Sequence, residues 1–322
     1  MGTPDFAVPA LEALVKAGHE AAAVVTQPDK PKGRGKAVLM TPVKEKALEY
    51  GIPVYQPKRV RDPEFIEVLR ALAPEVIVVV AFGQILPKEI LTLPPYGCVN
   101  IHASLLPKYR GAAPIQWAVI DGEAVSGVTT MQMDEGLDTG DILEQEEIPL
   151  DPAETGGSLF EKLSILGGKL IVSTLSGLEA GTLAPRPQGE SSTSYAKMLD
   201  KSMGEVDWTM EAAAIERLIR GLNPWPSAYT HYNGKTLKLW AAKVASEEEE
   251  KSVSSEAAKA VSGEASQGIP GRILVSKDAL LVETGAGFLS ITELQLEGKK
   301  RMETAAFLRG FSMETGTVLG RA

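Results

Sequence analysis

The stretch that decides the fold is Gly-Cys-Val-Asn-Ile-His-Ala-Ser-Leu-Leu-Pro-Lys-Tyr-Arg-Gly, residues 97–111. Polar and apolar residues alternate through its first half, which predicts a strand with Asn100 and His102 on one face. Turn-forming residues then lead into a helix predicted over residues 112–120. Ligands of open α/β sheets bind beyond the carboxyl ends of the strands, so this pair is well placed for chemistry. Taken alone, a histidine and an asparagine with structural roles in a strand would be the commoner arrangement.

Strand-like and helical patterns alternate on both sides of this stretch. A nearly continuous run of Val and Ile over residues 75–82 predicts a central parallel strand covered on both faces. Such β-to-α alternation favours an α/β fold with a Rossmann-like, doubly wound parallel sheet, which we place in residues 1–180. No Gly-x-Gly-x-x-Gly follows a strand and no Walker loop occurs, so neither a dinucleotide nor ATP is indicated.

The start of the chain lacks an element that this fold needs. A doubly wound sheet should have a strand before its first helix, which is predicted here over residues 6–17. The chain starts at Met1-Gly2-Thr3-Pro4-Asp5-Phe6 and supplies no residues for that strand. We therefore expect a misassigned start or a truncation, and a sheet with an exposed interior edge.

The last third of the chain has a different pattern. Residues 181–206 are rich in Pro, Gly, Ser and Thr, which predicts a linker. Five short strand patterns between residues 228 and 296 then predict a small C-terminal β-barrel of the OB type, in a second domain over residues 207–322. Residues 246–267 interrupt these strands with four consecutive Glu and no aromatic residue, and we expect them to be disordered.

Composition bounds the class of protein. The 322 residues, 44% hydrophobic and 23% charged, are typical of a soluble globular protein of about two domains. No apolar run approaches the roughly 18–20 residues of a membrane span, and no secretion signal is present. The one cysteine, Cys98, allows no internal disulfide and fits a reducing compartment. We predict a cytoplasmic protein without membrane association, and nothing demands more than a monomer.

The net charge of −9 hides two basic regions. Residues 30–46 hold six basic groups against one acid, and Gly33 and Gly35 leave the backbone flexible. This segment is either a solvated surface loop or a mobile basic arm for phosphates. Outside residues 246–267, the second domain holds 12 basic and nine acidic groups, so its predicted folded part is mildly basic.

Asp138 gives Asn100 and His102 a third partner. It lies between two glycines in the loop after a strand predicted over residues 127–133, and we expect this loop at the same end of the sheet as His102. A carboxylate beside an imidazole orients the ring and favours its cationic form, which can face a developing oxyanion. Asn100 adds a neutral amide donor. These groups suit transfer of an acyl group to an amine, in which the amine proton is also removed.

No serine or cysteine nucleophile accompanies these three residues. The Gly-x-Ser-x-Gly elbow is absent, and no histidine is paired with a serine or cysteine by a known motif. We therefore predict direct attack by the substrate amine, without an acyl-enzyme.

Four motifs resemble the 10-formyltetrahydrofolate-dependent formyltransferases. They are Asn100-Ile101-His102, Ser104-Leu105-Leu106-Pro107, Tyr109-Arg110-Gly111 and Leu137-Asp138-Thr139-Gly140-Asp141. By that resemblance Asn100, His102 and Asp138 are the catalytic residues, and 10-formyltetrahydrofolate is the formyl donor, with no metal. The resemblance also implies that the folate is bound by Asp138 and by two loops, consisting of Phe82, Gly83, Gln84, Ile85 and Leu86, and of Ser104, Leu105, Leu106 and Pro107.

Further motifs narrow the resemblance. They are Gly2-Thr3-Pro4-Asp5-Phe6-Ala7, Gly33-Arg34-Gly35-Lys36, Gly111-Ala112-Ala113-Pro114-Ile115-Gln116 and Asn223-Pro224-Trp225-Pro226. They are similar to family members that formylate the methionine carried by initiator tRNA. The resemblance therefore implies methionyl-initiator tRNA as the partner, contacted by Lys32, Arg34 and Lys36 and by the basic face of the barrel. The acidic residues 246–267 depart from the family pattern.

Three alternatives stay open. Another formyltransferase with the same catalytic domain could act on a sugar nucleotide or on glycinamide ribonucleotide, although such small acceptors need neither a basic loop nor a C-terminal barrel. A 10-formyltetrahydrofolate hydrolase uses a similar catalytic triplet. A non-catalytic RNA-binding module would need no Asn100, His102 and Asp138 set.

Overall fold

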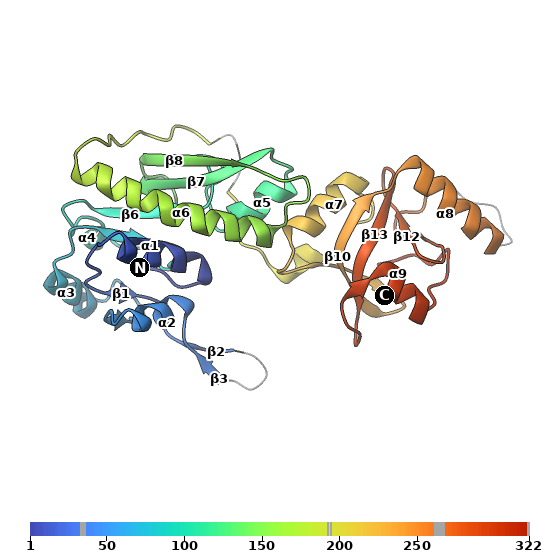
Figure 1. Cartoon of the computed structure of the whole chain (residues 1–322), viewed down its shortest axis with the longest axis horizontal. Coiled ribbons are helices and arrows are strands. Elements are labelled where there is room, and N and C mark those ends of the chain that lie inside the picture. Colours follow the sequence, from blue (N-terminus) through green and yellow to red (C-terminus); the bar gives the residue numbers. More distant parts are fainter. Residues whose placement is uncertain (33–36, 192, 194, 261–267, 321–322) are drawn as a thin grey trace. The chain divides into compact units, whose positions relative to one another are not determined.

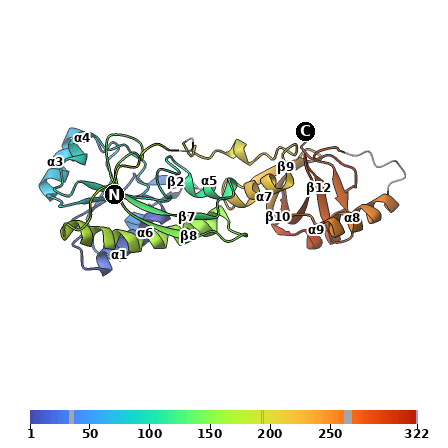
Figure 2. The ribbon, with the colours of Figure 1, turned by 90° about the horizontal axis from the view of Figure 1, so that it is seen from above.

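The computed structural model describes residues 1–32, 37–191, 193, 195–260 and 268–320. The chain divides into two compact units. Unit 1 consists of Met1–Ile115, Ala124–Leu150 and Ser158–Lys197, and unit 2 consists of Gln116–Glu123, Asp151–Gly157 and Met198–Ala322. Figures 1 and 2 show the helices and strands in two views related by a 90° turn. No helix among the described residues is long and apolar enough to cross a membrane.

Unit 1 is a mixed α/β structure. Its main sheet has the strand order β5-β6-β7-β8, with β5 Ile77–Val79, β6 Cys98–His102, β7 Val125–Gln132 and β8 Ile142–Pro149. A second pair, β1 Val24–Val25 and β4 Val54–Tyr55, is parallel. A third pair is antiparallel and consists of β2 Lys30–Lys32 and β3 Ala37–Leu39.

The prediction of an entirely parallel sheet is only partly right. Strands β5 and β6 are parallel, but β6 with β7 and β7 with β8 are antiparallel. Hydrophobic patterning identifies a buried strand without fixing its direction. For β7 and β8 the direction follows from the connection, because they are joined by a short loop without the crossover helix that parallel neighbours need.

Local sequence signals explain several helices of this region. Helix α2 begins after Thr41, whose hydroxyl oxygen accepts a hydrogen bond from the Lys44 N–H, and Pro42 occupies its first turn. Helix α6 lies along β6 and β7 (Figure 1), where Gly167 allows close approach to Ile101. The helical segments through this part of the chain are η1 Asp5–Ala7, α1 Val8–Lys16, α2 Pro42–Glu49, α3 Pro63–Leu72, α4 Lys88–Leu91, α5 Pro114–Ile120 and α6 Gly156–Glu179.

Unit 2 contains the predicted short strands in a curled antiparallel sheet. The strand order is β11-β12-β13-β10-β9, and β14 also pairs with β13. The inward side chains of these strands pack with Ile215 and Ile219 of helix α7. The elements are η2 Lys201–Gly204, α7 Ala212–Gly221, β9 Ala228–Tyr232, β10 Lys235–Val244, α8 Glu247–Ala260, β11 Ile273–Val275, β12 Leu280–Glu283, β13 Phe288–Leu296, β14 Met302–Glu303 and α9 Thr304–Gly310.

The acidic insert corrects one prediction. We predicted disorder over residues 246–267, but Glu247–Ala260 forms helix α8, and residues 261–267 lie outside the described part. Consecutive glutamates stabilise the first turn of a helix through its dipole, and Ser246 Oγ accepts from the Glu249 N–H. The buried side chain of Val253 packs against Leu281. The Glu249 carboxylate also accepts from the Ser290 hydroxyl and pairs with Lys243, so apolar and polar contacts together hold this helix despite its disorder-like composition.

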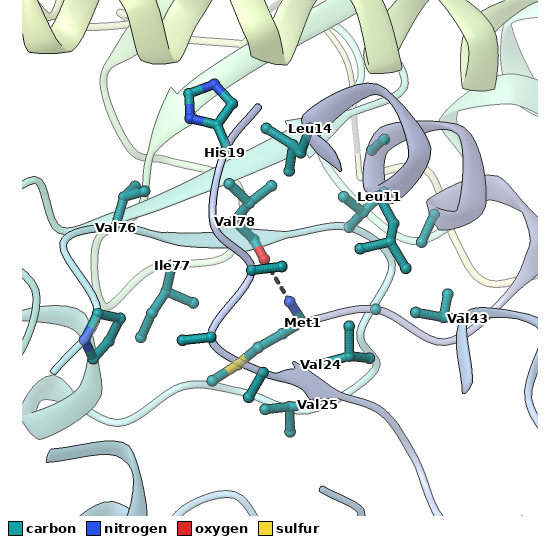
Figure 3. A pocket seen from close by; sticks show the side chains of 18 of the residues that line it. Met1, Leu11, Leu14, His19, Val24, Val25, Val43, Val76, Ile77 and Val78 are labelled. Atoms are coloured by element: carbon teal, nitrogen blue, oxygen red, sulfur yellow. Dashed lines mark hydrogen bonds between the residues drawn. The ribbon is translucent and has the colours of Figure 1, made fainter. Parts of the chain in front are cut away.

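The first two residues lie between β1 and β5. The Gly2 N–H donates to the Val25 carbonyl, and Gly2 pairs with Val80 in a parallel bridge. The Met1 nitrogen donates to the Val78 carbonyl at 2.6 Å beside an apolar cavity of about 280 Å³ (Figure 3). Apolar side chains of β1 and β5 are among those that line this cavity.

Candidate active site

Strand β6 presents the two side chains with which the predicted site begins. Asn100 pairs with Met131 of β7, and His102 pairs with Thr129, so their side chains share one face of the sheet. Asn100 is partly exposed and makes no side-chain hydrogen bond within the part of the chain that the structure describes. Its amide is therefore available to a ligand.

His102 is held from two sides. It is buried, and its Nε2 lies 2.8 Å from the Tyr109 carbonyl oxygen, which assigns the Nε2 proton to that bond. The Ser104 hydroxyl donates to the same carbonyl and accepts from the Tyr109 N–H. The ring is thereby fixed with Nδ1 at 3.6 Å from Oδ1 of Asp138. A proton on Nδ1 would face a carboxylate.

Asp138 reaches His102 by a route that differs from the predicted one. Strand β7 runs antiparallel to β6, so it ends with Gln132 beside Val99 and not at the His102 end. The loop over residues 133–141 must therefore fold back along the sheet to bring Asp138 to the imidazole. The prediction that Asp138 lies beside His102 is therefore right, but it was based on the wrong direction for β7.

The loop is stabilised by its own polar groups. The Asp134 carboxylate accepts hydrogen bonds from the Thr139 hydroxyl and the Gly136 N–H. A Cβ atom on Gly140 would overlap the Gln132 carbonyl, so this position requires glycine. At the tip, Asp138 Oδ2 accepts from the Gly111 N–H at 2.9 Å, which fixes the carboxylate beside the imidazole.

Residues that we placed in a linker contribute to this region of unit 1. Arg186 and Ile142 exchange two backbone hydrogen bonds, and Ala196 exchanges backbone hydrogen bonds with residues 110–112. The Ser191 hydroxyl donates to the Pro107 carbonyl at 2.9 Å. These contacts were not predicted, because isolated backbone bridges leave no periodic pattern in the sequence.

The first predicted folate loop follows β5 and is anchored through its backbone and Gln84. The Phe82 carbonyl accepts from the Thr3 hydroxyl and the Gln27 amide, and the Gln84 side-chain oxygen accepts from the Val60 N–H. Ile85 is 75% exposed, whereas its neighbours Phe82 and Leu86 are buried. Gly83 has a positive φ of 81°. The exposed apolar side chain at Ile85 is available to a flat hydrophobic ligand.

The second predicted folate loop joins β6 to the residues that fix His102. The Ser104 carbonyl accepts from the Thr129 hydroxyl, which in turn accepts from the Leu106 N–H. The Gln145 amide donates to the Leu106 carbonyl. Leu106 is buried, while Leu105 and Pro107 are partly exposed.

The predicted tRNA contacts lie in or next to the part of the basic segment that is not described. Lys32 is the last residue of β2, and Arg34 and Lys36 lie outside the described residues. At the base of the segment, Lys44 forms an ion pair with Asp29 at 2.5 Å. Among the described residues, no group of three or more His, Cys, Asp or Glu side chains could hold a metal ion.

An amide donor, a fixed imidazole and a carboxylate beside it form one surface of unit 1, close to two loops at the ends of β5 and β6. This arrangement can polarise a carbonyl and accept a proton from an attacking amine. The chain belongs to the formyl transferase family: residues 1–175 match the model described as Formyl transferase, and residues 198–312 match its C-terminal domain.

Curated relatives carry a more specific name. The chain is 57% identical to the methionyl-tRNA formyltransferase of Lachnospira eligens, over 99% of this chain and 98% of the relative. It is 51% identical to that of Geobacter sulfurreducens, over 100% of this chain and 96% of the relative. Among solved structures, the N-formyltransferase of Helicobacter canadensis, in complex with folinic acid and dTDP-3-aminofucose, has a TM-score of 0.62 at 18% identity, covering 94% of this chain and 97% of that one. This last likeness supports the fold alone.

Proposed function

We propose that this protein transfers the formyl group of 10-formyltetrahydrofolate to the amino group of methionyl-initiator tRNA. The observation that carries the proposal is the 57% identity, over nearly the full length of both chains, to a methionyl-tRNA formyltransferase. The contact between His102 and Asp138 beside the free amide of Asn100 supports the same chemistry. The product would be N-formylmethionyl-tRNA for translation initiation.

In the proposed reaction the methionyl amine attacks the formyl carbon directly. A bond forms between nitrogen and carbon while the carbonyl electrons move onto oxygen, where the Asn100 amide and a protonated His102 stabilise the charge. The protonated ring directs its Nε2 proton at the Tyr109 carbonyl and its Nδ1 proton at Asp138, so the Asp138 carboxylate is the group that takes up the amine proton. The bond from the formyl carbon to the folate nitrogen then breaks, and that nitrogen receives the proton.

The donor site and the tRNA site belong to the same proposal. Phe82–Leu86, Ser104–Pro107 and Asp138 would bind the folate, and Lys32, Arg34 and Lys36 would bind the tRNA. We propose that residues 1–180 form the catalytic domain, and that the curled sheet within residues 207–322 is an OB-type barrel that binds the tRNA backbone. The basic excess of that region outside residues 246–267 supports this role. We propose that the enzyme works as a cytoplasmic monomer without membrane association.

A formyl-transfer assay tests the proposal. The purified protein is given 10-formyltetrahydrofolate together with methionyl-initiator tRNA, an amino-sugar nucleotide, glycinamide ribonucleotide, or no acceptor. We expect formylated methionyl-tRNA as the product. Preferential formylation of a small amine, or formate release that needs no acceptor, would assign the protein to one of the alternative activities.

The basic segment can be tested separately. Arg34→Ala should raise the KM for methionyl-tRNA about tenfold and lower the salt slope of tRNA binding by about one, because one phosphate contact is lost. Binding of 10-formyltetrahydrofolate should not change. Arg70→Ala is the control, since Arg70 is an exposed arginine on α3, paired with Glu67. Equal losses of folate and tRNA binding in Arg34→Ala would contradict the assignment.

A further inference from the structure

Gln188 connects the two loops that meet at Asp138. Its Nε2 donates to the backbone carbonyls of Asp138, at 2.9 Å, and Gly140, at 2.6 Å. Its Oε1 accepts from Nε of Arg110 at 3.0 Å. The Arg110 Nη2 also donates to the Gly189 carbonyl. One carboxamide therefore ties the tip of the 133–141 loop to the residue that precedes Gly111.

The backbone at Asp138 needs such support. Asp138 has a positive φ of 55°, a left-handed conformation that a residue with a Cβ atom adopts only when surrounding contacts hold it there. This φ sets the direction in which the carboxylate points. The loop also leaves β7 next to Val99, at the end of β6 away from His102. The position of the carboxylate beside the imidazole thus depends on contacts at the tip of the loop.

The contacts at the tip form a closed circuit. The Asp138 side chain accepts from the Gly111 N–H, and the Asp138 carbonyl accepts from Gln188. Arg110, next to Gly111 in the chain, donates to Gln188. Only a carboxamide offers both the donors for the two carbonyls and the acceptor for the guanidinium. A carboxylate at position 188 would keep the bond to Arg110 and lose both bonds to the loop.

We propose that Gln188 is a positioning residue for formyl transfer, which holds the Asp138 carboxylate against Nδ1 of His102 without touching the substrates. The proposal rests on the proposed function for its kinetic effect, but the hydrogen-bond circuit itself exists in the free protein. Gln188 lies in the 181–206 segment, where sequence analysis predicted only a linker.

Kinetics of Gln188→Glu and Gln188→Ala test the proposal. We expect kcat to fall about 10- to 100-fold, the effect of a small misplacement in an active site, while both KM values stay within about threefold. Adding Gln188→Ala to Asp138→Asn should cause little further loss, because the group being positioned is already gone. Unchanged kcat in both single variants, or full additivity in the double variant, would overturn the proposal.

Gln56 provides a matched control in the same unit. Its Nε2 donates to the Gln27 carbonyl and to Asp29, and its Oε1 accepts from the Lys44 ammonium. Gln56→Ala thus also removes a carboxamide that donates to two oxygens and accepts from a cationic side chain, although one of the two oxygens belongs to a carboxylate. It should lower Tm by a similar amount and leave kcat within about twofold. A similar kcat loss in both variants would reduce the Gln188 effect to general destabilisation.

Amide hydrogen exchange separates this proposal from the proposed function. The Gly111 N–H is bonded to the Asp138 carboxylate, so Gln188→Ala should speed its exchange in the free protein about tenfold and leave Val99 in β6 unchanged. This result would support the positioning role even if wild type failed to formylate methionyl-tRNA. Unchanged exchange at Gly111 in an active enzyme would refute the positioning role alone.

Discussion

Asp138→Asn should lower kcat for formyl transfer by about a thousandfold, because a positioned proton acceptor contributes about 10²–10⁴-fold. Asparagine keeps the size of the side chain and an oxygen that can accept from the Gly111 N–H. It removes the negative charge that faces Nδ1 of His102 at 3.6 Å. The tRNA KM should change only a few-fold, since the proposed tRNA contacts stay in place.

The control for this variant lies in the same loop. Asp134→Asn also neutralises a carboxylate, one that accepts from Thr139 and Gly136. Single-turnover formyl transfer at saturating donor should show a much smaller effect there, together with a loss of stability. If Asp134→Asn and Asp138→Asn were equally impaired, loop distortion would explain the result and the proton-transfer role of Asp138 would fail.

Asn100→Ala should lower kcat about 100- to 1000-fold, the usual cost of removing one donor to an oxyanion. The Asn100 amide makes no side-chain hydrogen bond among the described residues, so its removal breaks nothing in the resting fold. The free energy of unfolding should therefore stay within about 0.5 kcal/mol of wild type. A large loss of kcat without a loss of stability identifies a group that acts in the transition state.

His102→Ala is the comparison for this second variant. It deletes a buried ring and the hydrogen bond to the Tyr109 carbonyl, so both kcat and stability should fall. Denaturant unfolding, measured together with kcat, distinguishes a loss of activity alone, expected for Asn100→Ala, from a loss of both activity and stability, expected for His102→Ala. Near-normal kcat in Asn100→Ala would remove the amide from the mechanism and leave the oxyanion to other groups.

Sequence patterns identified the secondary structure well where local rules decide it. Helix α3 is an example, because Pro63 marks its first turn and its apolar residues recur at helical spacing. Strands β9 and β13 lie at the two ends of the region, residues 228–296, in which five short strands were predicted. Helix α8 was missed, because contacts with distant strands, through Val253 and Glu249, organise a segment whose composition indicated disorder.

For the candidate site, too, local patterns predicted one part and not the other. The alternation in residues 97–111 was enough to place Asn100 and His102 on one face of a strand, since that depends only on the two-residue period of a β-strand. Asp138 was grouped with them correctly, yet its approach depends on the direction of β7 and on a loop that folds back. Neither can be derived from the local pattern of residues 127–141.

The sequence by itself determined the alternation of elements, the shared face of Asn100 and His102, and the motifs that indicate the family. These are properties of short stretches, fixed by backbone geometry and by residue type. Only the tertiary structure decided which strands are antiparallel and that Gln188 meets Asp138 from 50 residues away in the chain. Such contacts depend on how distant segments pack together, and a single side chain that makes them leaves no repeating signal in the sequence.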